Sequence, residues 1–147
     1  VVFMGKAELL KLPLFGYFFK QTSIAVDRSS FSGRKQAMID ADQKIKEGYS
    51  VCIFPEGGVP EDESIVLDAF KDGAFRLAIE HKIPIIPMTF ADNKELFSFT
   101  FLSGSMGKMR VKVHKPIETQ NLLTEDKVMI KEKVRNTILE QLYIFNN

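Results

Sequence analysis

The sequence has few of the residues that build disulfide-stapled or metal-dependent proteins. Its 147 residues include one cysteine, Cys52, and two histidines, His81 and His114. A single cysteine excludes an internal disulfide framework and fits a reducing compartment. Two isolated histidines and one cysteine, which we expect inside a buried strand, offer no cluster of metal ligands. We therefore expect no metal site.

Long apolar runs and long runs of one charge are also missing. No stretch approaches the roughly 18–20 apolar residues of a membrane-spanning helix, and no signal peptide is recognisable. Twenty basic and nineteen acidic residues give a net charge of +1, and this balance does not suggest a nucleic-acid surface. The Gly-rich fingerprint of nucleotide-binding loops is absent too. We therefore expect this chain neither to cross a membrane by itself nor to bind nucleic acids, and the sequence does not favour an unrelated nucleotide-binding α/β domain.

The apolar residues that are present predict an α/β fold. They make up 45% of the sequence, enough for the core of one ordinary domain. Apolar runs alternate with helical patterns, which predicts a largely parallel sheet with flanking helices, a mixed sheet being the alternative. The predicted strands are residues 22–26, 50–53, 85–90 and 109–114. The predicted helices run from caps within 29–32 to Gly48, from Asp72 to about His81, and from a cap at Thr124 to Phe145.

The most informative segment is the loop Phe54-Pro55-Glu56-Gly57-Gly58, which directly follows the apolar run 50–53. Apolar residues followed by Pro and paired Gly are typical of a strand leaving its sheet, and ligands of α/β sheets gather at the carboxyl ends of strands. The run 22–26 delivers the charged pair Asp27-Arg28 to the same kind of edge. We therefore predict that two strand ends converge on one ligand.

These segments occur in the order of the conserved blocks of glycerolipid acyltransferases. Val26-Asp27-Arg28 looks like the family's second block, Phe54-Pro55-Glu56-Gly57 like its third, and Ile83-Pro84-Ile85-Ile86-Pro87-Met88 like its fourth. Phe70-Lys71-Asp72-Gly73 matches the linking Phe-Lys-x-Gly. From about Lys6 to Pro116, the chain thus resembles the 1-acylglycerol-3-phosphate acyltransferases, which make phosphatidic acid.

The resemblance implies acyl transfer from an acyl thioester, either acyl-CoA or acyl carrier protein, to a hydroxyl of lysophosphatidate or a related lysolipid. It implies no cofactor, and a location at the cytoplasmic face of the membrane, peripheral or anchored through other segments. The aromatic clusters at residues 14–19 and 96–101 suit contact with a membrane surface, the first being flanked by Lys11 and Lys20. Core packing is the alternative for these clusters. The sequence leaves the oligomeric state open.

One block of the family has no counterpart in this chain. The family's first block is a His and an Asp separated by four residues, and that pair performs the chemistry. Five positions after His81 and His114 stand Ile86 and Thr119, which cannot orient an imidazole. The chain also opens on apolar residues 1–4 without an initiating Met.

We therefore expect the catalytic pair upstream, with no catalytic residue in this chain. Residues 1–147 are then the C-terminal part of a single catalytic domain, truncated at its N-terminus and inactive alone. An upstream region without the pair would favour the alternative, a non-catalytic lipid- or phosphate-binding module that retains the acceptor pocket.

The resemblance assigns three cations to the acceptor's phosphate. Arg28 comes first, because a guanidinium at a strand end can hold two phosphate oxygens at once. Lys6 and Lys71 follow, since they match the Lys after the first block and the Lys of Phe-Lys-x-Gly. The alternative for Arg28 is an ion pair with Asp27 or Glu56. For either lysine the alternative is an ordinary surface charge.

Asp27 beside Arg28, Glu56 and the two glycines after Glu56 complete the predicted substrate-binding set. Glu56 is expected to accept a hydrogen bond from a glycerol hydroxyl or to hold Arg28 in place. Gly57 and Gly58 are expected to let the backbone turn tightly and to offer amide hydrogens to an anion. Ordinary turn glycines are the alternative.

The acceptor itself is left open by a departure from the family's pattern. The family usually continues Glu-Gly-Thr-Arg, whereas this chain continues Glu56-Gly57-Gly58-Val59 and then reaches the acidic run 61–63. The missing arginine is a phosphate ligand in the family, and the acidic run would repel a dianionic head group. Either the remaining cations suffice for lysophosphatidate, or the acceptor carries another head group. Those cations are Lys6, Arg28 and Lys71, with Arg34 and Arg76 as further candidates.

Overall fold

The computed structural model of the protein describes residues 1–58, 62, 64–96 and 104–146. Two compact units divide the chain, Val1–Gly58 and Val59–Asn147, and each is described by itself. The single domain expected from the length of the chain stays a prediction.

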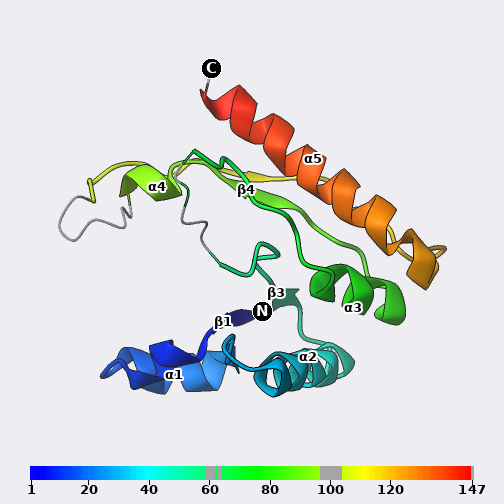
Figure 1. Ribbon diagram of the computed structural model, residues 1–147, viewed down its shortest axis with the longest axis horizontal. Helices are drawn as coiled ribbons and strands as arrows, with labels where there is room; N and C mark the ends of the chain where they lie inside the picture. Colours follow the sequence, from blue (N-terminus) through cyan, green and yellow to red (C-terminus); the bar gives the residue numbers. More distant parts are fainter. Residues whose placement is uncertain (59–61, 63, 97–103, 147) are drawn as a thin grey trace. The chain divides into compact units, whose positions relative to one another are not determined.

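The first unit is built on a three-stranded parallel sheet (Figure 1). Strand β1 (Val2–Lys6) lies in the middle, between β2 (Ser23–Val26) and β3 (Val51–Cys52). The predicted strand 22–26 is therefore confirmed, as is the α/β class. The apolar start of the chain forms the central strand, and Val2 is buried there.

The predicted strand 50–53 differs from the structure in length and burial. Only Val51 and Cys52 pair with β1, and among the described residues β3 forms an edge of its sheet. Cys52 is half-buried rather than buried. The expectation of a buried strand was therefore wrong, since both residues of β3 are half-buried. Burial still raises the pKa of the Cys52 thiol.

Two helical segments connect β1 to β2. The 3₁₀ helix η1 (Ala7–Lys11) follows β1 directly, and α1 (Phe15–Thr22) leads into β2. Phe19 of α1 is buried, and a Cβ built on Gly5 of β1 would lie 2.8 Å from its ring. Glycine at position 5 therefore makes room for the aromatic ring that packs α1 on the sheet.

Helix α2 (Phe31–Lys46) connects β2 to β3 and confirms the predicted helix. Ser30 caps it, since its hydroxyl oxygen accepts a hydrogen bond from the Gly33 amide at 3.0 Å. Its buried residues are Ala37 and Ala41, which share the predicted apolar face. The chain leaves the helix through Gly48, whose φ of +87° favours glycine.

The second unit contains a two-stranded antiparallel sheet of β4 (Met88–Phe90) and β5 (Val111–Val113). The predicted strands 85–90 and 109–114 are found at these places but are shorter. Before β4, only an isolated bridge joins Ile85 to Ile117. Pro87 stands between this bridge and β4, and proline has no N–H to donate to a ladder. The short helix α4 (Asn93–Leu96) follows β4.

The two remaining predicted helices are confirmed, with one correction. Helix α3 (Gly73–His81) ends at His81 as expected. The last helix, α5 (Lys127–Asn146), begins after the 3₁₀ turn η2 (Thr124–Asp126), so the predicted cap at Thr124 was wrong. Instead, the Asp126 carboxylate accepts a hydrogen bond from the Leu123 amide at 2.8 Å.

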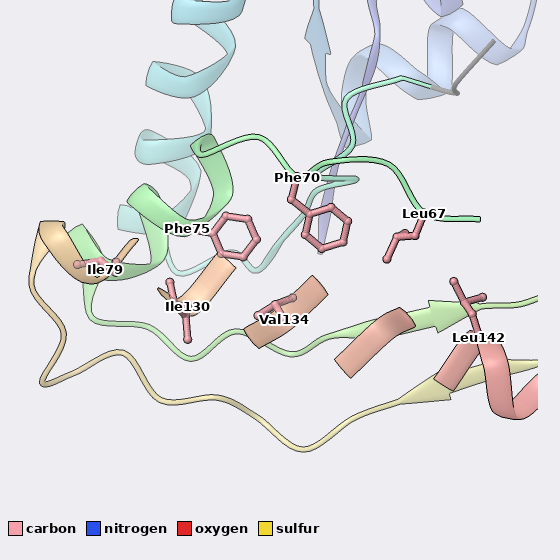
Figure 2. Packing of buried hydrophobic residues seen from close by; sticks show 7 residues of the cluster. All are labelled: Leu67, Phe70, Phe75, Ile79, Ile130, Val134 and Leu142. Atoms are coloured by element: carbon pink, nitrogen blue, oxygen red, sulfur yellow. The ribbon is translucent and has the colours of Figure 1, made fainter. Parts of the chain in front are cut away.

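The core of the second unit joins α5 to α3 and to the segment before α3. Figure 2 shows that Ile130 and Val134 of α5 lie beside Phe70 and Phe75. The two phenylalanine rings stack with centroids 6.2 Å apart. The seven residues of this cluster are Leu67, Phe70, Phe75, Ile79, Ile130, Val134 and Leu142.

Candidate functional site

The parallel sheet of the first unit brings the predicted site residues to one edge. Lys6 ends β1 and is level with Val26, the last residue of β2. Asp27 and Arg28 follow β2 directly. Since β3 also runs parallel to β1, the loop at 54–58 leaves the sheet at the same carboxyl edge. The predicted convergence of strand ends on one edge is therefore found, with Lys6 between the other two segments in strand order.

Asp27 organises the turn that starts α2. One carboxylate oxygen accepts hydrogen bonds from the Ser29 amide, at 2.9 Å, and the Ser29 hydroxyl. The other accepts from the Ser30 hydroxyl at 2.8 Å. These bonds, from the Ser29 side chain first and then from Ser30, lower the pKa of Asp27. Asp27 thus stays ionised as a structural acceptor.

Gly33 and Ser30 belong to this turn, and sequence reasoning did not assign them to the site. A Cβ built on Gly33 would lie 2.6 Å from the Asp27 Cβ and 2.7 Å from its carbonyl oxygen. No larger residue fits there unless the backbone moves. The only sequence signal for this turn is the group of serines after Asp27, which by itself indicates no more than a helix cap.

Arg28 lies within this turn, between Asp27 and Ser29. Its side chain is half-buried, and its carbonyl oxygen accepts a hydrogen bond from the Arg34 guanidinium at 2.6 Å. In the part of the chain that the structure describes, no ion pair joins Arg28 to Asp27 or to Glu56. The structure therefore does not support the alternative of a salt bridge, nor the holding of Arg28 by Glu56.

The loop after β3 turns sharply at the predicted glycines. Gly57 has a φ of +72°, which favours glycine, and its amide donates a hydrogen bond to the Phe54 carbonyl at 3.1 Å. That amide is therefore committed to the turn, contrary to the expectation that it is available to an anion. Gly58 has no such φ, and a side chain there would meet open space. Glu56 is half-buried within the turn.

Other predicted cations and acids have different surroundings. Lys71 is exposed and belongs to the second unit, so the structure does not group it with Lys6 and Arg28. Arg76 forms an exposed ion pair with Glu80 at 3.6 Å. In the acidic run 61–63, only Asp62 is among the described residues, and its carboxylate accepts hydrogen bonds from Ser64.

Both histidines lie at the ends of secondary-structure elements. His81 is the last residue of α3, and His114 follows β5 with its Nε2 2.8 Å from the Thr89 hydroxyl. Burial, with the Lys112 charge as a lesser cause, lowers the pKa of His114. Within the described ranges, no three His, Cys, Asp or Glu side chains gather in a way that could hold a metal ion.

Helix α1 exposes an unusual number of large apolar side chains. Leu14, at its start, is 83% exposed, and Tyr17 and Phe18 are 67% and 65% exposed. No helix among the described residues has both the length and the apolar character to span a membrane. The second aromatic cluster, residues 96–101, lies outside the described residues after Leu96.

Comparisons with known proteins agree with this arrangement. The chain is 33% identical, over 145 residues, to the 1-acyl-sn-glycerol-3-phosphate acyltransferase of Saccharomyces cerevisiae. The matched region covers 94% of this chain and 46% of the yeast protein. It is 26% identical over 117 residues to 1-acyl-sn-glycerol-3-phosphate acyltransferase alpha of Homo sapiens, covering 79% and 41% of the two chains. The chain thus spans about half the length of the curated relatives it matches.

A solved structure supports the fold. The crystal structure of the 1-acyl-sn-glycerophosphate acyltransferase PlsC from Thermotoga maritima superposes with a TM-score of 0.77 at 20% identity, covering 99% of this chain and 56% of that one. The model of the Acyltransferase family matches residues 1–91, which include Lys6, Arg28 and the loop at Glu56. The chain therefore belongs to the Acyltransferase family.

Proposed function

We propose that the protein transfers an acyl group from an acyl thioester to a hydroxyl of lysophosphatidate in phospholipid synthesis. The observation that carries this proposal is the family match over residues 1–91, which contain the sheet edge with Lys6 and Arg28. The yeast and human relatives named for this reaction support the choice of acceptor. Acyl-CoA and acyl carrier protein are the two candidate donors.

The reaction needs a base, which this chain does not supply. In the proposed mechanism, a His upstream of Val1 accepts the proton of the acceptor hydroxyl, and an upstream Asp orients that His. The hydroxyl oxygen then attacks the thioester carbonyl carbon, the C–S bond breaks, and the thiolate leaving group takes up the proton. The present chain contributes the cations that hold the acceptor.

Arg28 is the proposed principal ligand of the acceptor's phosphate. Arg28 is half-buried, and its guanidinium has no ion pair among the described residues, so its hydrogen-bond donors remain for a ligand. Helix α2 begins three residues later, at Phe31, and the positive end of its dipole lies at the same edge. Lys6, exposed at the end of β1, adds a second charge.

An acyl-transfer assay tests this proposal. We expect the complete protein to make phosphatidate from lysophosphatidate and either acyl-CoA or acylated acyl carrier protein. The purified 147-residue chain should give no phosphatidate above the enzyme-free control, because it contains no His and Asp at the family's spacing. Lysolipids whose phosphate is a diester serve as comparison acceptors.

The outcomes separate the alternatives. Transfer to a diester acceptor but not to lysophosphatidate would contradict the choice of head group. A complete protein that binds lysophosphatidate but transfers nothing would favour the non-catalytic binding module. Appreciable turnover by the 147-residue chain would contradict the upstream location of the catalytic pair.

We propose that α1 is a surface that contacts the membrane, at the cytoplasmic face where the acceptor lipid lies. The apolar side chains that it exposes to water would gain by entering the interfacial zone of a bilayer. Lys11 and Lys20 flank this surface and are both exposed, which favours a bilayer that contains anionic lipid. Phe19, by contrast, is buried against the sheet, so only part of the helix is available to a membrane.

Fluorescence provides a direct test, because the chain contains no tryptophan. We expect Tyr17→Trp to shift its emission to shorter wavelength on mixing with anionic vesicles and to be quenched by brominated lipid. Phe31→Trp is the matched control, since Phe31 is 77% exposed at the start of α2 and lies outside the proposed surface. Equal responses of the two variants, or no response from Tyr17→Trp, would contradict the proposed surface.

A further inference from the structure

Both polar atoms of the peptide group that joins Arg28 to Ser29 are bound by side chains. The Arg34 guanidinium donates a hydrogen bond from Nη1 to the Arg28 carbonyl oxygen at 2.6 Å. The Asp27 carboxylate accepts a hydrogen bond from the Ser29 amide at 2.9 Å. Because a peptide group is planar and rigid, its C=O and N–H can only turn together. This peptide plane is therefore held from both sides.

The backbone before this peptide group is anchored as well. Val26, two residues before Arg28, is the last residue of β2 and pairs with Lys6 of β1. A Cβ built on Gly33 would lie 2.7 Å from the Asp27 carbonyl oxygen, so the first turn of α2 packs directly on the backbone at Asp27. Arg28 thus stands between a strand end and a peptide group whose orientation is fixed.

Arg34 is an unusual residue for its place in α2. It lies in the first turn of the helix, where its amide donates a hydrogen bond to the Ser30 carbonyl at 3.3 Å. The positive end of a helix dipole favours acidic side chains in the first turn and disfavours basic ones, yet the first turn of α2 contains no acid. The charge of Arg34 therefore does not stabilise the helix. Residues that break a local rule are expected at functional sites, and the hydrogen bond to Arg28 accounts for this one.

The two arginines of this turn have different surroundings. Arg28 is half-buried, and in the part of the chain that the structure describes its guanidinium has no ion pair. Arg34 is exposed and uses its guanidinium on the Arg28 carbonyl. From the sequence, both were candidate ligands of the acceptor's phosphate. Their contacts instead indicate separate roles, because only Arg28 keeps its donors for a ligand.

We infer that Arg34 is a positioning residue for Arg28. Together with Asp27, it fixes the peptide group after Arg28 and thereby the direction in which the Arg28 side chain leaves the backbone. This inference rests on the proposed function, in which Arg28 binds the acceptor's phosphate. A guanidinium binds two phosphate oxygens in parallel only in the right orientation, so a small rotation of the backbone at Arg28 weakens binding even though the charge remains.

Steady-state kinetics of the complete protein test this role. Arg34→Met keeps a long side chain that favours a helix but removes the guanidinium. We expect it to lower kcat/KM for lysophosphatidate about three- to tenfold, through a higher KM with kcat unchanged, because binding of the distant phosphate is weakened. The KM for the acyl donor should stay unchanged. Arg34→Lys can still donate one hydrogen bond to the Arg28 carbonyl, so its kcat/KM should lie between those of the wild type and Arg34→Met.

A double-mutant cycle distinguishes positioning from direct binding of the phosphate. In an Arg28→Ala background, Arg34→Met should have no further effect on kcat/KM for lysophosphatidate, because the guanidinium that it positions is gone. If Arg34 itself bound the phosphate, its loss would lower kcat/KM by the same factor in both backgrounds. Effects that multiply would therefore overturn the inference.

Lys35 provides the matched control. It is exposed and follows Arg34 directly in α2, so Lys35→Met removes one positive charge from the same helical turn. We expect both KM values of this variant to stay within about twofold of the wild type. The melting temperatures of Arg34→Met and Lys35→Met should stay within about 2 °C of the wild type, since both side chains are exposed. Equal losses of kcat/KM in the two variants would show that only the local charge matters, which contradicts positioning.

The outcomes separate the inference from the proposed function. If the wild-type protein transfers nothing to lysophosphatidate, or if Arg28→Ala leaves kcat/KM unchanged, the assigned role of Arg28 fails and the inference falls with it. If Arg28→Ala lowers kcat/KM but Arg34→Met does not, only the inference is overturned. The same holds if Arg34→Met raises the donor and acceptor KM values alike.

Discussion

Replacing Arg28 with alanine is expected to lower kcat/KM for lysophosphatidate about 10- to 150-fold in the complete protein. This range corresponds to the loss of one hydrogen-bonded charge pair, about 1.5–3 kcal/mol. The guanidinium has no ion pair among the described residues, so its donors are available to the phosphate and their loss should have a large effect. For the same reason, the substitution leaves no buried carboxylate unpaired. The change therefore reports on the ligand and not on the fold. Initial rates at varied acceptor concentration give the result.

Two companion variants sharpen this measurement. Arg28→Lys keeps the charge but cannot bind two phosphate oxygens in parallel, so it should fall between wild type and Arg28→Ala. Lys46→Ala removes one exposed positive charge from the last turn of α2, at the opposite end of the helix from Ser30, and should change kcat/KM less than twofold. If Arg28→Ala behaves like Lys46→Ala, Arg28 does not bind the acceptor.

Replacing Phe75 with alanine is expected to lower the free energy of unfolding by about 3–5 kcal/mol. Phe75 is among the largest fully buried side chains, with 2% of its surface exposed, and it stacks on Phe70 in the core of the second unit. Its removal leaves a cavity between α3 and α5 that the surrounding side chains fill only in part. For a chain of this length the melting temperature should fall on the order of 10 °C.

An exposed phenylalanine provides the control for this prediction. Phe31 is 77% exposed, so Phe31→Ala should change the free energy of unfolding by no more than about 0.5 kcal/mol. Thermal unfolding followed by circular dichroism compares the two variants. Similar melting temperatures for Phe75→Ala and Phe31→Ala would show that the cluster around Phe75 contributes little to stability.

The sequence predicts the helices best, because their signals are local. The spacing of Ala37 and Ala41 in α2 and of Ile130 and Val134 in α5 marks the faces that the structure buries. The serines before α2 predict its start correctly. Thr124 misleads at the start of α5, because a 3₁₀ turn comes first and the Asp126 carboxylate takes over the capping. Local propensity does not distinguish these two endings.

For the candidate site, the sequence predicts only which residues lie at the same edge of the sheet, because strand direction determines this. Once β1, β2 and β3 run parallel, Lys6, Arg28 and Glu56 must follow strand ends at one edge. The partners of each side chain depend on contacts that no spacing reveals. Arg135 of α5 donates hydrogen bonds to the Asp68 and Leu67 carbonyls, which stand 67 and 68 positions before it, and neither end of these contacts carries a recognisable motif.

Lys6 is separated from the apolar helix α1 only by η1 and the residues that link the two helices. Gly16 of α1 lies so close to the Leu10 carbonyl oxygen of η1 that a Cβ there would clash with it. The backbones of η1 and α1 therefore pack directly against each other. A bilayer that takes up α1, as proposed, also sets the height of Lys6 above the acyl chains. For such a protein, the rate depends on the mole fraction of lysophosphatidate within the membrane surface. Diluting lysophosphatidate with inert phospholipid should therefore slow the reaction even when the total lysophosphatidate concentration in the sample is kept constant.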